Sequence, residues 1–308
     1  MADATAALEL LEFQADDELE QELQTNLAQL NCSLEECELE QSLSGSCDKN
    51  GAYLIINTAI DDLDAQDWAE MLRRMYYRWG ENRGYKVADV EDSLLEYLEI
   101  NSAILVRGGV NSVTLAIDGR YAYGYLKSET GVHLLKPTSP FNITRKQASS
   151  ATVEIVPMYV ELEIPQQDLE LIILPRSNLK SSDPLESWRR IVHIPTGISA
   201  ISGEYRSPLQ NRERALAVLT SKLFAIMQRQ GVQELADIQG EILKTVLNQP
   251  IREYQFASDS ANQGKVLDLR TGIQTTAVAE VLDGKLDSFI KAGVLLKNWF
   301  AHLEQNFS

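Results

Sequence analysis

The sequence predicts an α+β fold. Short strand-like segments, in which apolar residues alternate with polar ones or run together, are separated by single long amphipathic helices, without a strict strand–helix alternation. Of the 308 residues, 44% are hydrophobic and 24% are charged, which is the balance of an ordinary globular chain. This length allows two or three domains, so we expect more than one buried core.

The strands are recognised by period-two alternation and by turn residues at their ends. They are expected at residues 53–60, 85–90, 103–106, 113–117, 153–156, 159–164 and 169–174, followed by a hairpin of residues 189–193 and 198–201 around Pro195-Thr196-Gly197. No sequence repeat links these segments, so a repeat architecture is not expected.

Apolar residues at spacings of three and four predict the helices. The helices are expected at residues 5–40, 66–83, 211–230, 235–247 and 289–305. The first has a leucine stripe from Leu19 to Leu34, with acidic residues on its other face. Asn31-Cys32-Ser33 is expected to interrupt it, because serine is a good N-cap. Residues 42–51 are small and polar and are expected to form a linker.

The net charge of −17 is concentrated at the N-terminus. Residues 1–50 hold 13 acidic residues and one basic residue, whereas residues 51–308 have a net charge of only −5. A protein that grips duplex nucleic acid usually carries a basic surplus, so any RNA contact is expected on a local basic face. The sequence has no apolar run of membrane-spanning length and begins without a secretory signal.

The sequence suggests no metal site, cofactor or catalytic group. Cys32, Cys37 and Cys47 lie in the acidic segment, do not have the paired spacing of zinc ligands, and are distant in sequence from the three histidines. Reduced thiols are expected, and a redox pair of Cys32 and Cys37 is the alternative. No nucleophile lies beside a base in a recognisable pattern.

Five blocks carry a resemblance to a known family. They are residues 67–79 (Asp-Trp-Ala-Glu-Met-Leu, then Met-Tyr and Arg-Trp), residues 119–133 (Gly-Arg-Tyr-Ala-Tyr-Gly, then Glu-Thr-Gly-Val-His), residues 139–141 (Ser-Pro-Phe), residues 193–198 (His-Ile-Pro-Thr-Gly-Ile) and residues 268–290 (Asp-Leu-Arg-Thr-Gly, then a block ending in Asp-Ser-Phe-Ile). In order and spacing, the chain resembles bacterial-type class-I peptide chain release factors, specifically those that read UAA and UGA.

The resemblance implies a multi-domain release-factor fold with a shortened N-terminal helical domain. It implies an acidic helical segment at residues 1–46 and a codon-reading-type α+β domain at residues 47–164. Residues 165–247 correspond to the hydrolytic domain, and residues 248–308 are expected to complete the central superdomain together with residues 47–164. The shortened N-terminus removes part of the surface that the family offers to the ribosome.

The chain departs from the family where the family's chemistry lies. In the family, a glycine-rich loop ending in Gly-Gly-Gln enters the peptidyl transferase centre, and a backbone N–H at the glutamine stabilises the charge that develops during ester hydrolysis. Here, no glycine occurs between Gly131 and Gly197, and the corresponding interval 175–188 contains Pro175, Pro184 and Asp183. The sequence therefore predicts that the protein does not hydrolyse peptidyl-tRNA and is not an enzyme.

The codon-reading loop is also altered. Ser139, Pro140 and Phe141 match the family tripeptide, but the glycine pair and His-Thr pair that follow it in the family are replaced by residues 142–150, which are one residue fewer. The tripeptide is expected either to contact a base or to form a simple turn with a buried Phe141. Stop-codon reading is not expected to survive.

Basic residues near the expected RNA-facing elements are candidates for RNA binding. Besides Ser139, Pro140 and Phe141, these candidates are Arg145, Lys146, Arg189, Arg190, Arg206, Arg212 and Arg214, and Tyr205 is a candidate to stack on a base. The alternative is an ordinary solvated charged surface.

Release-factor relatives that lack both motifs are known in plant plastids, where such a paralogue stabilises and processes particular transcripts. The resemblance implies a chloroplast stromal RNA-binding protein whose transit peptide has been removed, with single-stranded mRNA or the ribosome as its partner. The first expectation is binding of a specific plastid mRNA. The alternatives are a ribosome-associated factor that occupies the decoding site without hydrolysis and, as a distant third, a hydrolase with another nucleophile. The acidic N-terminal helix is a further candidate surface for protein partners, and no membrane contact is expected.

Overall fold

The computed structural model divides the chain into two compact units, residues 1–44 and 45–308. It describes residues 21, 24–27, 30, 39–59, 63–91, 110–136, 148–174, 188–203, 205–238, 250–256 and 264–306. In the first unit, residues 21, 24–27, 30 and 39–42 are helical, as expected for the leucine-stripe helix. The predicted interruption at residues 31–33 lies outside the described residues.

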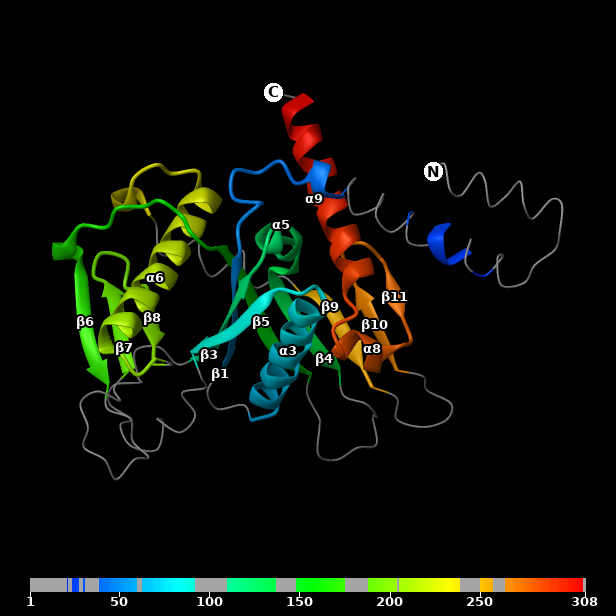
Figure 1. The fold of residues 1–308 in the computed structure, drawn as a ribbon, viewed down its shortest axis with the longest axis horizontal. Coiled ribbons are helices and arrows are strands. Elements are labelled where there is room, and N and C mark those ends of the chain that lie inside the picture. The colour runs from blue at the N-terminus through cyan, green and yellow to red at the C-terminus, as the bar shows by residue number, and fades with distance from the viewer. Residues whose placement is uncertain are drawn as a thin grey trace. The chain divides into compact units, whose positions relative to one another are not determined.

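The second unit is built around an eight-stranded sheet (Figure 1). Its strands lie in the order β11-β10-β9-β4-β5-β1-β3-β2. Their bounds are β1 Ala52–Ala59, β2 Lys86–Glu91, β3 Val110–Asp118, β4 Gly131–Lys136, β5 Ser149–Pro157, β9 Pro250–Gln255, β10 Lys265–Asp268 and β11 Gln274–Thr275. Every neighbouring pair is antiparallel except β4 and β9, which are parallel.

Helix α3 (Leu63–Asn82) covers one face of this sheet, and its apolar stripe explains why. Trp68, Leu72, Met75 and Trp79 are at most 1% exposed, and their spacing places them on one side of the helix. The remaining helices of the region are α5 (Ala122–Leu126), the 3-10 turn η2 (Lys127–Glu129), α8 (Val278–Leu282) and α9 (Asp287–Asn306).

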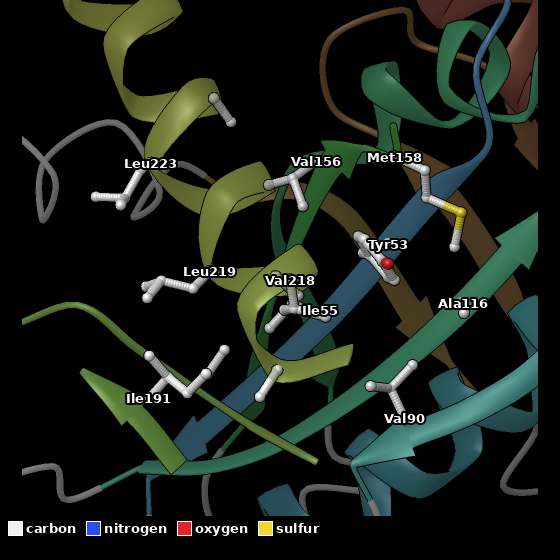
Figure 2. Close-up of a cluster of buried hydrophobic side chains, with 13 residues drawn as sticks. Tyr53, Ile55, Val90, Ala116, Val156, Met158, Ile191, Val218, Leu219 and Leu223 are labelled. Carbon is white, nitrogen blue, oxygen red and sulfur yellow. The ribbon is translucent and has the colours of Figure 1, made fainter. Parts of the chain in front are cut away.

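Helix α6 (Pro208–Gln230) packs between the other face and a second sheet of three antiparallel strands. These strands are β6 (Leu169–Leu174), β7 (Trp188–His193) and β8 (Ser199–Ser202), with β7 in the centre. Figure 2 shows Tyr53 and Ile55 of β1 grouped with Val218 and Leu219 of α6 and Ile191 of β7 in one buried cluster. This core joins the two sheets through α6.

The ends of α6 follow from its sequence. Ser207 is the N-cap, and its side chain accepts a hydrogen bond from the backbone N–H of Gln210. Pro208 occupies the first turn, where a missing N–H costs nothing. Gly231 ends the helix in the left-handed conformation, with φ of 66°. The helix therefore has a fixed N-terminus at residues 205–211.

The structure confirms the α+β class and most of the predicted elements. The strands expected at residues 53–60, 85–90, 113–117, 153–156 and 169–174 are present, as are the hairpin and the helices expected near residues 66–83, 211–230 and 289–305. The strand expected at 103–106 lies outside the described residues. Among the described residues, no helix combines the length and the apolar character needed to cross a bilayer.

One expected strand is absent, and two other expectations are met or tested only in part. Residues 159–164 alternate like a strand but form none, because Tyr159 adopts a left-handed φ of 55° and the chain turns there. The helix expected at residues 235–247 begins as a 3-10 turn, Leu235–Asp237, and residues 239–247 lie outside the described residues. The boundary between the two compact units falls after Ser44, inside the linker expected at residues 42–51. The second half of this segment is held in place, because the Asp48 carboxylate accepts hydrogen bonds from the Lys127 ammonium and the Gly45 N–H.

The domain boundaries expected after residues 46, 164 and 247 stay predictions. The segment from Pro250 to Asp268 contributes β9 and β10 to the sheet that also contains β1, β4 and β5.

Candidate nucleic-acid interface

Three of the five resemblance blocks meet in a buried ionic cluster centred on Arg252 of β9. Arg252 Nη1 and Nη2 donate to the two carboxylate oxygens of Glu129 at 2.6 and 2.7 Å, and Nη2 also lies 3.1 Å from Asp268 Oδ2. The guanidinium stacks on the Phe289 ring, with 4.5 Å between its carbon and the ring centroid. All three charged side chains are fully buried. Such paired geometry is the arrangement in which a buried charge is tolerated.

Aromatic residues complete this cluster around His133 of β4. The Tyr76 hydroxyl donates to Glu129 Oε2 at 2.9 Å, and the Tyr254 hydroxyl lies 3.1 Å from His133 Nδ1. Trp68 Nε1 donates to the His133 carbonyl at 3.0 Å. Helix α3, η2, β4 and β9 are thus joined by polar contacts inside the core.

The electrostatics of the cluster favour fixed charge states. Burial raises the pKa of Asp268, but its bonds to Arg270 and Arg252 lower it to about 2. Burial likewise opposes ionisation of Glu129, and Arg252 outweighs it, so that the pKa is lowered. Burial, reinforced by Arg252, lowers the pKa of His133 to about 4. At neutral pH the cluster is an ionised Arg–Glu–Asp group beside a neutral imidazole.

This cluster explains the matching blocks without any ligand. Its charged groups are sealed from solvent and paired with one another, so they have no free face for a substrate. The blocks at residues 67–79, 129–133 and 268–290 therefore specify the fold of the central sheet. Among the described residues, no group of three or more histidine, cysteine, aspartate or glutamate side chains is arranged to hold a metal ion.

Most of the two loops in which the chain departs from the family lies outside the described residues; the described ends, residues 148–150 and Trp188, lead into or belong to β5 and β7. Ser139, Pro140, Phe141, Arg145 and Lys146 fall in the segment between β4 and β5. Residues 175–187, where the family carries its catalytic loop, fall between β6 and β7. The roles expected for these residues stay predictions.

The structure separates the two candidate arginines of β7. Arg189 is only 7% exposed, and its Nη1 lies 3.5 Å from the Trp188 carbonyl. Arg190 is partly exposed, and its Nε and Nη2 donate to Ser199 Oγ on β8 at 3.1 and 3.0 Å. Arg190 therefore has some surface to offer RNA, whereas Arg189 has little.

The other three candidate arginines lie together at the N-terminus of α6. Arg206 and Arg212 are exposed and form no ion pair within the described part of the chain. Arg214 is half-buried, stacks on the Tyr53 ring at 5.1 Å, and donates from Nη1 to the Tyr53 hydroxyl at 3.2 Å. The region between residues 205 and 214 is thus a local basic face on a chain of acidic net charge.

The sequence did not reveal how Tyr205 is held beside these arginines. The buried Asn211 side chain accepts a hydrogen bond from the Tyr205 N–H at 2.9 Å and donates one to the Tyr205 carbonyl at 2.7 Å. The only indication in the sequence was a polar residue, Asn211, one turn into the expected helix. Asn211 fixes the backbone that presents the tyrosine.

Comparison with known proteins gives the same assignment from several directions. The PCRF domain family matches residues 1–153. The chloroplastic peptide chain release factor PrfB1 of Arabidopsis thaliana is 42% identical over 274 residues, which cover 86% of this chain and 57% of that protein. The chain thus spans little more than half the length of this relative.

Bacterial relatives are covered more fully. Peptide chain release factor 2 of Listeria innocua is 37% identical over 292 residues, which cover 93% of this chain and 76% of that protein. The solved structure of RF2 of Thermus thermophilus superposes with a TM-score of 0.70 at 29% identity, covering 96% of this chain and 84% of that one. The chain belongs to the bacterial-type class-I peptide chain release factor family.

Proposed function

We propose that this protein is a non-hydrolytic member of the release factor family that binds RNA and stabilises or processes a specific plastid mRNA. The observation that carries the proposal is the glycine-free interval from residue 132 to residue 196, which excludes a Gly-Gly-Gln tip. Without that tip, the chain lacks the backbone donor that stabilises the developing charge in ester hydrolysis.

The retained fold supports binding without hydrolysis. The buried cluster around Arg252 lies within the central sheet, and a basic face at the N-terminus of α6 is formed by Arg206, just before the helix, and by Arg212 and Arg214. Arginine contacts with phosphate supply most of the sequence-independent affinity for RNA. A bound protein that covers a single-stranded stretch shields its phosphodiester bonds from nucleases, which stabilises the transcript and defines its processed end.

The plastid location is part of the proposal. One relative is named a chloroplastic release factor, and at 42% it is more similar in sequence to this chain than the Listeria protein is. We assign the protein to the chloroplast stroma on this similarity.

The alternative is a ribosome-associated factor that occupies the decoding site without peptide release. It is favoured by the names of the relatives, which are release factors, and by the extent of the structural match to RF2. Both functions share the loss of hydrolysis and differ in the RNA that is bound.

Two experiments test the proposal. Ribosomes programmed with each stop codon and carrying peptidyl-tRNA are expected to release no peptide above the no-factor background when the protein is added. A control reaction with an intact release factor must release peptide. Codon-dependent release by this chain would overturn the non-hydrolytic assignment.

The second experiment identifies the RNA. Immunoprecipitation from chloroplasts, followed by sequencing of the bound RNA, is expected to give one mRNA region in large excess. Ribosomal RNA together with many mRNAs would support the ribosome-associated alternative instead.

A further inference from the structure

We infer that Tyr159 and Tyr205, together with Arg214, form a base-stacking platform for single-stranded RNA. The inference rests on the proposed RNA binding and names the surface and the chemistry that it uses. Tyr159 and Tyr205 are separated by 46 positions in the sequence, but both lie in segments that are linked to Tyr53. Tyr159 follows β5, which pairs with β1, and Tyr205 is hydrogen-bonded to Asn211 of α6, the helix whose Arg214 stacks on Tyr53. The residues that surround them explain why the rings stay exposed.

Tyr159 is held out of the core by its backbone. It is 71% exposed, the most exposed large hydrophobic residue among those described, and its φ of 55° is uncommon for a bulky residue. Its hydroxyl donates to Asp118 Oδ2 at 3.0 Å, while the neighbouring Met158 N–H donates to the Gly51 carbonyl. A left-handed backbone at a bulky residue costs free energy, and an exposed ring gains little from burial. Such residues cluster at functional sites, so Tyr159 is a candidate for one.

Tyr205 is fixed by a different device. The two hydrogen bonds from Asn211, which is 1% exposed, hold its backbone at the N-terminus of α6, and its side chain is 38% exposed. A ring on a fixed backbone loses little conformational entropy when a base stacks on it.

Arg214 connects α6 to β1. It stacks on Tyr53 of β1 and donates from Nη1 to the Tyr53 hydroxyl at 3.2 Å, and β1 pairs with β3, which ends at Asp118, and with β5, which precedes Tyr159. On the same helix, Asn211 lies three residues before Arg214 and holds the backbone of Tyr205. The Arg214 Nε is buried and forms no hydrogen bond within the described structure.

The chemistry of this surface fits single-stranded RNA. Residues 205–214 carry three arginines and one glutamate, and the nearby Asp118 carboxylate already accepts the Tyr159 hydroxyl. Aromatic faces next to cations bind bases and phosphates at once, and stacking tolerates any base. A duplex keeps its bases stacked internally, so it offers these rings nothing to bind.

The test uses the full chain and two labelled probes, an oligouridylate and an abasic ribose-phosphate strand of equal length, followed by fluorescence anisotropy. The wild-type protein is expected to bind the oligouridylate more tightly. In the Y159A/Y205A variant, the affinity for oligouridylate is expected to fall at least about fivefold for each lost stack, while the affinity for the abasic strand stays unchanged. The Y159F/Y205F variant keeps both rings and is expected to bind like the wild type.

The matched controls are Leu269→Ala and Leu295→Ala, which remove exposed apolar side chains of similar accessibility elsewhere on the second unit. Both are expected to leave binding unchanged. If the wild-type protein binds the two probes equally, or if Y159A/Y205A retains full affinity for oligouridylate, the platform is overturned while RNA binding stands. If the wild-type protein binds neither probe nor immunoprecipitated transcript, the proposed function fails with it.

Discussion

Arg252 and Arg214 both stack on an aromatic ring, but the two guanidinium groups differ in burial and in ion pairing. Arg252 is fully buried over Phe289 and is ion-paired with Glu129 and Asp268. Arg214 is half-buried over Tyr53 and forms no ion pair with a described residue. The Nε atoms of both arginines are buried without a hydrogen-bond partner, so the two residues differ in their ion pairs and their exposure. The difference teaches that a cation paired with carboxylates inside the fold has no free face for a ligand, whereas a partly exposed cation without an ion pair is available for one.

The same contrast explains which parts of the sequence match the family. The blocks around Trp68, His133 and Asp268 build the buried cluster, so they must persist if the fold persists. The departures in the two loops fall largely in segments 137–147 and 175–187, which lie outside the described residues. The family's fold and the family's chemistry are thus carried by different parts of the sequence, so agreement in the fold does not establish the chemistry.

The most severe way to break this comparison is to remove the buried cation. Arg252→Ala leaves Glu129 and Asp268 as buried charges without their main partner, and the free energy of unfolding is expected to fall by about 3–5 kcal/mol. Urea denaturation followed by circular dichroism measures the loss. The control is Lys285→Ala, which breaks the exposed pair with Glu280 and is expected to leave the midpoint nearly unchanged. Equal effects of the two variants would show that the buried cluster does not stabilise the fold.

The second prediction concerns the neutral imidazole of the cluster. The pKa of His133 is about 4 in the folded protein, below the ordinary 6.5, so the unfolded chain binds more protons as the pH falls. The free energy of unfolding therefore keeps its full value above pH 6.5 and falls as the pH drops from 6.5 to about 4. From pH 7 to pH 5, the free energy of unfolding is expected to fall by about 2 kcal/mol.

The measurement is urea denaturation at both pH values for the wild type and for His133→Gln. The variant removes the titrating group, so most of the pH dependence in this window is expected to disappear. Burial also lowers the pKa of His193, and His193→Asn is the comparison variant. A loss of pH dependence in His193→Asn and not in His133→Gln would contradict the assignment.

The fold was largely predictable from the sequence, and the exceptions have identifiable causes. Helix α3 and strands β1, β3 and β6 carry clear periodic patterns. Strands β4 and β9 were missed because buried polar residues interrupt their apolar patterns: His133 in one, and Arg252 with Glu253 in the other. A charged side chain in a strand is interpreted as a surface residue unless its partners are known, and Glu129 lies 123 positions from Arg252 and Asp268 lies 16.

The candidate site was less predictable. The basic face at residues 205–214 was visible as a cluster of arginines. Which of Arg189 and Arg190 reaches the surface depends on the pairing of β7 with its neighbours. Alternation at residues 159–164 predicted a strand and so concealed the exposed Tyr159. Its left-handed backbone is set by the turn after β5, which no local propensity signals.

The smallest expected effect separates two arginines that the sequence placed in one class. Arg212 is exposed, so Arg212→Gln is expected to lower the slope of log affinity against log salt by about 0.7, the value for one lost phosphate contact on single-stranded RNA, without changing stability. Arg189 is buried, so Arg189→Gln is expected to leave the slope unchanged and to reduce the free energy of unfolding by about 1–3 kcal/mol. Oligouridylate binding at several salt concentrations, together with urea denaturation of each variant, gives both quantities. If Arg189→Gln lowers the slope as Arg212→Gln does, the buried arginine contacts RNA. Burial would then not separate the arginines that bind RNA from those that stabilise the fold.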